Sequence, residues 1–223
     1  GLGGVEITPI YGVQGNDAHE IPFLSPDWMR MLQHTRSECK RLGMETDMNA
    51  GTGWPFGGPM ISLENAATKA IFREYAAKGG ERLRTAIEAE DRKQRDVANL
   101  SRLMAFSDKG ERIDITSKVK NNRLDWTVPA GNWRLIALFC GKTFQQVKRA
   151  APGGEGYVMD HFSRNAVKQY FATFEQAFRE NKVPYPHAFF NDSYEVYGAD
   201  WTPGLLDEFV RRRGYRLENY LPE

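Results

Sequence analysis

Strand-like and helix-like patterns alternate at the start of the chain. Residues Gly4–Tyr11 are β-branched and aromatic, which predicts a strand. Ser25–Asp27 combines an N-cap serine, a proline at the first helical position and an acidic first turn, so we expect a helix from there to Gly43. Met44–Asn49 predicts a second strand. A strand, a helix and a strand in this order form a βαβ unit, which implies parallel strands.

The pattern changes between about residues 62 and 148. Short extended segments there alternate with turn signals such as Asp108–Gly110, Asn121–Asn122 and Pro129–Asn132. Such spacing predicts a small antiparallel β-domain. The expected strands are Ala70–Tyr75, Leu103–Phe106, Arg112–Ile115 and Trp133–Phe139.

The α/β pattern then resumes. Ser163 is the expected N-cap of a helix that runs to about Asn181, His187–Phe190 is the expected next strand, and Thr202 is the expected N-cap of a last helix that ends at Gly214. We therefore predict the α/β class, as a partial (β/α)8 TIM-type barrel with an inserted small antiparallel β-domain. The predicted domains are 1–62 (first barrel part), 63–148 (inserted β-sandwich-like module) and 149–223 (barrel continuation).

Composition narrows the classes of partner. The 223 residues are 41% hydrophobic and carry 30 Lys and Arg against 29 Asp and Glu, a net charge of +1. This balance disfavours nucleic acid, which needs a clear basic excess. No apolar run approaches the roughly 20 residues of a membrane span. Cys39 and Cys140 form neither a disulfide framework nor a metal-binding spacing. The chain lacks a starting Met and a signal peptide, so we expect it to be part of a longer protein.

Polar residues follow the predicted barrel strands at their carboxyl ends, where barrel active sites are built. Asn49 ends the second strand, and Asn191, Asp192 and Glu195 follow the later one. Glycoside hydrolysis needs one carboxylic acid that protonates the leaving oxygen and a second carboxylate opposite it. We expect Glu195 to be the acid. Its pKa should be raised by nearby Tyr194, Tyr197, Trp201 and Asp192. The alternative is that a carboxylate here, above all Asp192, only caps the following helix.

Three other sites each allow two interpretations. Trp54 and Phe56, in the Gly/Pro-rich loop 50–59, would form a sugar-stacking rim or plug the edge of the core. Asp160 and His161 would contact substrate or merely begin a helix. Lys148 and Arg149, before a Gly-rich stretch, would cradle an anion or pair with carboxylates. The histidines show no metal-ligand spacing.

Four motifs in order resemble glycoside hydrolase family 106, whose known members are α-L-rhamnosidases. They are LGGVEI (Leu2–Ile7), LGMETDMNAGTGWPFGGP (Leu42–Pro59), VKRAAPGGEGYVMDHFS (Val147–Ser163) and FFNDSYEVYGADWTPGLLDEFVRRRGY (Phe189–Tyr215).

The resemblance implies a (β/α)8 barrel, an inverting mechanism, a rhamnose-containing glycan as substrate, a secreted or periplasmic location, and a calcium ion whose ligands we do not assign. It implies that Glu195 is the general acid. Asn191 and Asp192 would hold sugar hydroxyls or lie near the metal, and Asn49 and Trp54 would shape the rim.

Without the module, about 137 residues remain for a barrel that usually needs about 250. We therefore expect the catalytic base to lie outside this chain, the chain alone to be inactive or nearly so, and its open strand edges to favour self-association.

Three alternatives stay open. The first is another barrel hydrolase, such as a β-galactosidase-like enzyme, which would differ only in substrate. The second is a non-catalytic carbohydrate-binding module, in which Glu195→Gln would leave the rate unchanged. The third is a fragment that folds and binds nothing.

Overall fold

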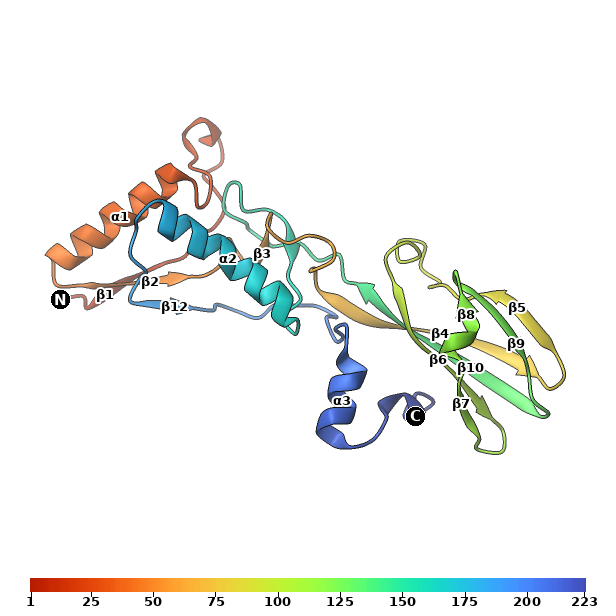
Figure 1. The fold of residues 1–223 in the computed structure, drawn as a ribbon. Helices are drawn as coiled ribbons and strands as arrows, with labels where there is room; N and C mark the ends of the chain where they lie inside the picture. The colour runs from red at the N-terminus through yellow and green to blue at the C-terminus, as the bar shows by residue number, and fades with distance from the viewer. The chain divides into compact units, whose positions relative to one another are not determined.

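The computed structural model describes residues 1–223, and these residues form two compact units. The α/β unit comprises residues 1–67 and 143–199, and the β unit comprises 68–142 and 200–223. Figure 1 labels the three α-helices and most of the strands. The α/β unit contains β1 (Gly4–Ile7), η1 (Asp17–His19), α1 (Pro26–Arg41), β2 (Glu45–Asn49), β3 (Gly57–Gly58), β11 (Tyr157–Val158), α2 (Arg164–Glu180) and β12 (Ala188–Phe190). The β unit contains β4 (Thr68–Lys78), β5 (Arg82–Ala86), β6 (Asn99–Ser107), β7 (Arg112–Asp114), η2 (Thr116–Lys118), β8 (Val119–Lys120), β9 (Arg123–Thr127), β10 (Asn132–Lys142), α3 (Leu205–Arg213) and η3 (Leu217–Tyr220).

A parallel sheet with the order β1-β2-β12 organises the α/β unit. Helices α1 and α2 both lie over one face of this sheet (Figure 1). Met48 of β2 faces the helices and is fully buried among Met29, Leu32 and Phe174. The α/β class and the predicted parallel βαβ unit are thus confirmed. The sheet is open, and the chain forms no closed barrel.

The helix starts of the α/β unit follow the sequence signals. The hydroxyl of Ser25 accepts a hydrogen bond from Trp28 N at 3.2 Å, and that of Ser163 accepts one from Ala166 N at 3.3 Å. Each bond satisfies one of the backbone donors that a helix N-terminus leaves free. The first strand is shorter than predicted, because pairing with β2 stops at Ile7.

Two antiparallel sheets build the β unit, in the orders β4-β10-β6-β7 and β5-β9-β8. They share one apolar core, to which Leu103, Leu135 and Ala137 contribute from the first sheet and Leu124 from the second. All four strands predicted in residues 63–148 are present; three are longer than predicted, and β7 is one residue shorter. The Asn121–Asn122 turn has both residues at positive φ.

The C-terminal segment packs in the β unit, although the sequence analysis assigned it to the barrel continuation. The second face of β10 is also apolar, and its Leu138 and Cys140 are covered by Trp201 and Leu206. Thr202 is not the N-cap of the last helix, contrary to prediction. Gly204, in the left-handed conformation at φ 79°, precedes α3 instead. Gly214 ends the helix as predicted, at φ 77°.

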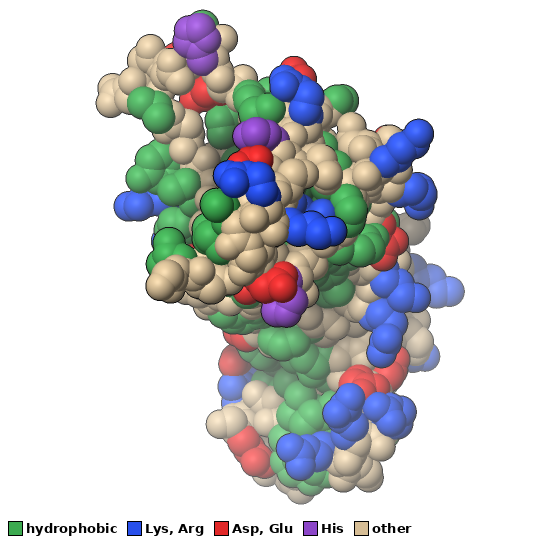
Figure 2. Space-filling view, turned by 90° about the vertical axis from the view of Figure 1, so that its left-hand side faces the viewer, with side chains coloured by type: hydrophobic (Ala, Val, Ile, Leu, Met, Phe, Trp, Pro, Cys, Tyr) green, Lys and Arg blue, Asp and Glu red, His purple; other side chains and the backbone are tan.

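Charges of both signs are mixed over the surface. On the face drawn in Figure 2, Lys and Arg side chains are interspersed with Asp, Glu and hydrophobic side chains. No helix of the chain is both long and apolar enough to cross a membrane.

Candidate active site

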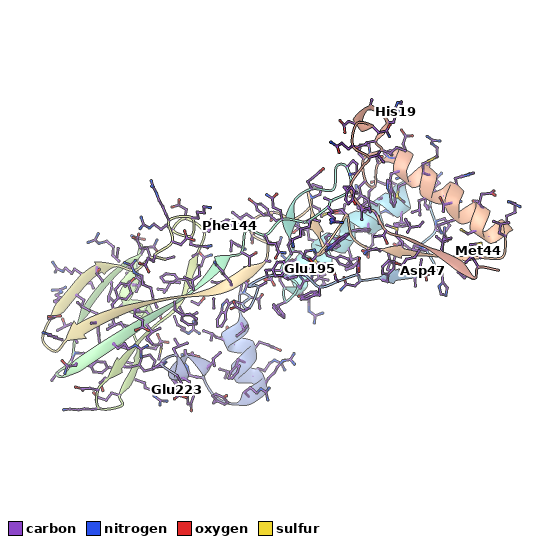
Figure 3. All side chains as sticks on the ribbon, turned by 180° about the vertical axis from the view of Figure 1, so that it is seen from behind. His19, Met44, Asp47, Phe144, Glu195 and Glu223 are labelled. Atoms are coloured by element: carbon purple, nitrogen blue, oxygen red, sulfur yellow. The ribbon has the colours of Figure 1, made fainter.

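The site residues predicted after β2 and β12 lie at the carboxyl edge of the parallel sheet. Asn49 at the end of β2 is the register partner of Phe190 at the end of β12, so the loops that follow both strands leave the sheet at the same edge. Figure 3 shows Met44 before β2, Asp47 within it and Glu195 beyond its carboxyl end. Because parallel α/β sheets place ligands outside these strand ends, this edge is the candidate active site.

Three side chains hold the Glu195 carboxylate. Ser193 Oγ donates a hydrogen bond to Glu195 Oε1 at 3.2 Å, and the Tyr197 hydroxyl donates one to Oε2 at 3.2 Å. Lys148 Nζ lies 3.5 Å from the same Oε2. The Glu195 side chain keeps 34% of its surface exposed, so it is fixed in position and still accessible to a ligand.

The loop that carries Glu195 is also anchored through its backbone. Gln145 Nε2 donates to the Glu195 carbonyl at 2.7 Å, and Gln145 Oε1 accepts from Tyr197 N at 2.9 Å. Lys148 Nζ lies 4.6 Å from the centre of the Tyr197 ring, a cation–π distance. Sequence reasoning missed the role of Gln145, since no motif marks an amide that bridges two backbone groups 50 residues away.

The expectation that the pKa of Glu195 is raised is wrong. Burial does raise it, but the hydrogen bonds from Ser193, Tyr197 and Lys148 and the charge of the Lys148 ammonium together hold the pKa of this carboxyl below its usual value. Tyr197 donates a hydrogen bond to the carboxylate through its hydroxyl and does not surround it with an apolar ring. Trp201, which was also expected to raise this pKa, is buried in the β unit with Leu138 and Leu206. As the structure stands, Glu195 is ionised at neutral pH.

Lys148 and Arg149 make different contacts. Lys148 pairs with a carboxylate, as one of the two predicted alternatives had it. The Arg149 guanidinium lies over two aromatic rings, 5.8 Å from the centre of Trp54 and 5.6 Å from that of Tyr11. The site therefore carries two cations from adjacent positions of the chain, Lys148 in an isolated β-bridge with Trp54 and Arg149 in the turn that follows.

The two aromatic side chains of loop 50–59 have different surroundings. Phe56 is buried and stacks on Tyr170 with ring centres 5.7 Å apart, so it belongs to the core. Trp54 is half-buried, and its backbone pairs with that of Lys148 through N–H to carbonyl bonds of 3.2 and 2.9 Å. Only Trp54 is thus brought beside the residues that hold Glu195.

Asn49 carries an unusual buried amide. It is 1% exposed, and neither its Oδ1 nor its Nδ2 has a hydrogen-bond partner. Unsatisfied buried amides are rare, since each lost bond costs about 1–3 kcal/mol. The Asn49 side chain is therefore a buried polar group at this strand end whose hydrogen-bonding capacity is unused.

Asp160 and His161 precede α2 without starting it, because Ser163 is the N-cap. Asp160 is buried, and its Oδ1 accepts from Phe162 N at 2.9 Å. The His161 ring meets the Tyr194 ring edge-on at 4.6 Å. Burial lowers the pKa of His161, so the imidazole is neutral at pH 7. These two residues border the Glu195 loop through Tyr194.

Asn191 and Asp192 are exposed in the loop after β12. Asp192 Oδ1 accepts from Ser193 N at 2.8 Å, which stabilises the turn. The alternative that Asp192 caps the following helix is wrong, because residues 191–199 contain no helix and Gly204 precedes α3.

The residues of this chain do not fit a complete calcium site. Calcium takes six to eight oxygen ligands, usually with several carboxylates. No three Asp, Glu, His or Cys side chains gather here around a point where a metal ion would bind.

Comparisons with known proteins agree on one class of enzyme. The sequence profile of glycoside hydrolase family 106, described as alpha-L-rhamnosidase, matches residues 1–111 and 94–223. A curated protein of Formosa agariphila, named "Putative beta-glucuronidase", is 28% identical over 262 aligned positions that cover 98% of this chain. The solved structure of a rhamnosidase from Novosphingobium sp. PP1Y superimposes over 100% of this chain with a TM-score of 0.81 at 17% identity.

Both relatives are much longer than this chain. It spans 22% of the Formosa protein and 38% of the Novosphingobium chain.

Proposed function

We propose that this chain, which belongs to glycoside hydrolase family 106, forms the acid-bearing part of the catalytic site of an α-L-rhamnosidase, with Glu195 as proton donor. The observation that carries the proposal is the Glu195 carboxylate, held by Ser193, Tyr197 and Lys148 at the carboxyl edge of a parallel sheet. Catalytic groups of (β/α) barrels occupy this position.

In this proposal the parallel sheet is one part of a (β/α)8 barrel, and the β unit is an insertion into it. The order β1-β2-β12 with helices on one face supports this assignment. Glu6, Asp47 and Ala188 share one register and point away from the helices, as interior residues of a barrel do.

The acid role requires Glu195 to gain a proton that the free chain does not hold at neutral pH. A sugar ring placed against the carboxyl would displace water, and loss of the Lys148 contact would remove the cation that favours the charged form. Both changes raise the pKa of a carboxylic acid. Lys148 lies at 3.5 Å, a loose contact that substrate would readily exchange.

An inverting reaction needs a second carboxylate about 6.5–9.5 Å from the acid, with water between them. We propose that this base comes from a part of the whole enzyme outside residues 1–223. The Asp192 carboxylate accepts a hydrogen bond from Ser193 N within its own turn, and Asp160 is buried. Calcium would likewise need ligands from outside these residues.

Around the acid, the site offers groups suited to a neutral sugar. The unsatisfied Asn49 amide would hydrogen-bond a hydroxyl. Trp54 would stack on an apolar sugar face, and Asn191 and Asp192, both exposed, would bind further hydroxyls. His161 would donate or accept as a neutral imidazole. The substrate would be a rhamnose-containing glycan, and the enzyme would act outside the cell or in the periplasm.

Hydrolysis of a glucuronide is a second candidate, favoured by the two cations of the site. A glucuronide carries a carboxylate that Lys148 or Arg149 would pair with, and one relative is named a putative β-glucuronidase. A rhamnose ring carries no such charge.

A substrate comparison tests both candidates. This chain and the longer protein that contains it would be assayed on an aryl α-L-rhamnoside and an aryl β-D-glucuronide, with and without added calcium. We expect the longer protein to cleave the rhamnoside and this chain to cleave neither. Cleavage of the glucuronide alone would replace the proposed substrate, and cleavage by this chain would refute the proposal that the base lies elsewhere.

A further inference from the structure

One face of the β unit is strongly basic. Residues that line a surface hollow of about 710 Å³ there include five cations and one carboxylate, an excess of four positive charges. The charged residues are Arg82, Arg84, Lys118, Lys120, Arg123 and Asp125. By contrast, the whole chain has a net charge of only +1.

The strand pleat creates this face. In the sheet β5-β9-β8, Leu83, Leu124 and Val119 turn toward the core of the β unit. Side chains alternate along a strand, so Arg84, Asp125, Arg123 and Lys120 turn outward together. Their register places Arg84 opposite Asp125 and Lys120 opposite Arg123. Figure 1 shows the three strands side by side.

Most of the positive charge is not neutralised within the chain. Arg82 forms a two-pronged ion pair with Asp125, at 2.7 and 2.9 Å, and Arg84 lies 3.7 Å from the same carboxylate. Lys118, Lys120 and Arg123 form no ion pair. Like charges directly opposite each other on neighbouring strands destabilise a sheet, so the Lys120–Arg123 pair opposes folding.

We propose that this outer face of β5-β9-β8 binds an acidic polysaccharide through its sulfate or carboxylate groups. Lysine and arginine side chains spread over the three strands and η2, and three of the five form no ion pair, so this face matches anionic groups that repeat along a chain. We choose a saccharide because the chain belongs to a glycoside hydrolase family. The proposal concerns binding by the β unit and does not depend on the reaction proposed for Glu195.

Affinity measurements on this chain test the proposal. The probes would be heparin for sulfate groups, polygalacturonate for carboxylates, dextran as the neutral saccharide and a short DNA duplex for phosphate. The test variant is Lys120→Gln with Arg123→Gln, and the charge-matched control is Lys93→Gln with Lys109→Gln, two exposed lysines outside the hollow. Circular dichroism melting would show that both variants fold.

We expect heparin or polygalacturonate to bind, with an affinity that falls as salt rises, and dextran not to bind. The test variant should weaken binding about tenfold, through two lost charge contacts, and the control less than about twofold. A response to heparin alone or polygalacturonate alone would identify the anionic group. Equal weakening in both variants, absence of binding to both anionic saccharides, or tighter binding of DNA would overturn the proposal.

Discussion

The buried hydroxyl of Tyr170 provides a quantitative test of how the core supports the candidate site. Tyr170 is fully buried on α2, and its hydroxyl donates a 2.7 Å hydrogen bond to the carbonyl of Ala50, the first residue after β2. Burial raises the pKa of Tyr170 far above its usual value, so the group remains a donor at any working pH. The bond ties the start of the rim loop to the helix layer.

Replacing Tyr170 by Phe removes this bond and leaves the rings otherwise in place. A net hydrogen bond contributes about 0.5–1.5 kcal/mol, and an acceptor left buried adds to the loss, so we expect destabilisation by about 1–2 kcal/mol. For a chain of this size that corresponds to a fall in Tm of roughly 2–8 °C.

The assay is thermal unfolding followed by circular dichroism. Tyr185→Phe is the matched control, because Tyr185 is 54% exposed and its hydroxyl makes no hydrogen bond. Its Tm should stay within about 1 °C of the parent chain, as expected of a surface substitution. Equal Tm values for the two variants would refute the argument that the Ala50 bond stabilises the unit.

Three further predictions concern the same unit. Ser25→Ala should cost about 0.5–2 kcal/mol in urea unfolding, because the N-cap bond to Trp28 N is lost; an unchanged midpoint would contradict this. Gly53→Ala should destabilise the chain by more than about 1 kcal/mol, because the new Cβ would overlap the Lys148 carbonyl; a neutral effect would show that the loop readily shifts. Lys148→Met should raise the pKa of Glu195, whose folded value is now lowered. In the active longer protein, the alkaline limb of the rate profile should then move to higher pH, whereas a shifted acidic limb would indicate that Glu195 works as a base.

Local signals predicted much of the fold. Ser25 and Ser163 cap helices because the bond between a side chain and the backbone is decided within four residues of sequence. Gly43 and Gly214 adopt positive φ for a similarly local reason. Strands of the β unit were located by turn signals between them.

Long-range packing explains the errors. Residues 135–140 (LIALFC) are buried on both faces of β10, and such a run needs cover on each side. That requirement draws Trp201 and Leu206 into the β unit, although the helix that contains Leu206 matches an α/β pattern. The sequence shows the apolar run 135–140, but it does not show which segment of the chain covers the second face of that run.

The candidate site was likewise predictable where local sequence decides and not where long-range contacts decide. The position of Glu195 after a strand was predictable, while its proton affinity was not. Its pKa depends on Lys148, 47 residues earlier in the chain, and on whether Tyr197 presents its ring or its hydroxyl. Spacing along a sequence carries no information on either point.

The most direct test of the central claim is the leaving-group dependence of Glu195→Gln in the longer protein, with Asp192→Asn as control. A general acid matters most when the departing oxygen needs a proton. We expect the variant to lose about 10²–10⁴-fold in rate on a rhamnoside with a poor leaving group, and less than about tenfold on a dinitrophenyl rhamnoside. The control should show no such difference between the two substrates. Equal losses by Glu195→Gln on both substrates, or no loss on either, would contradict the assignment of Glu195 as the proton donor.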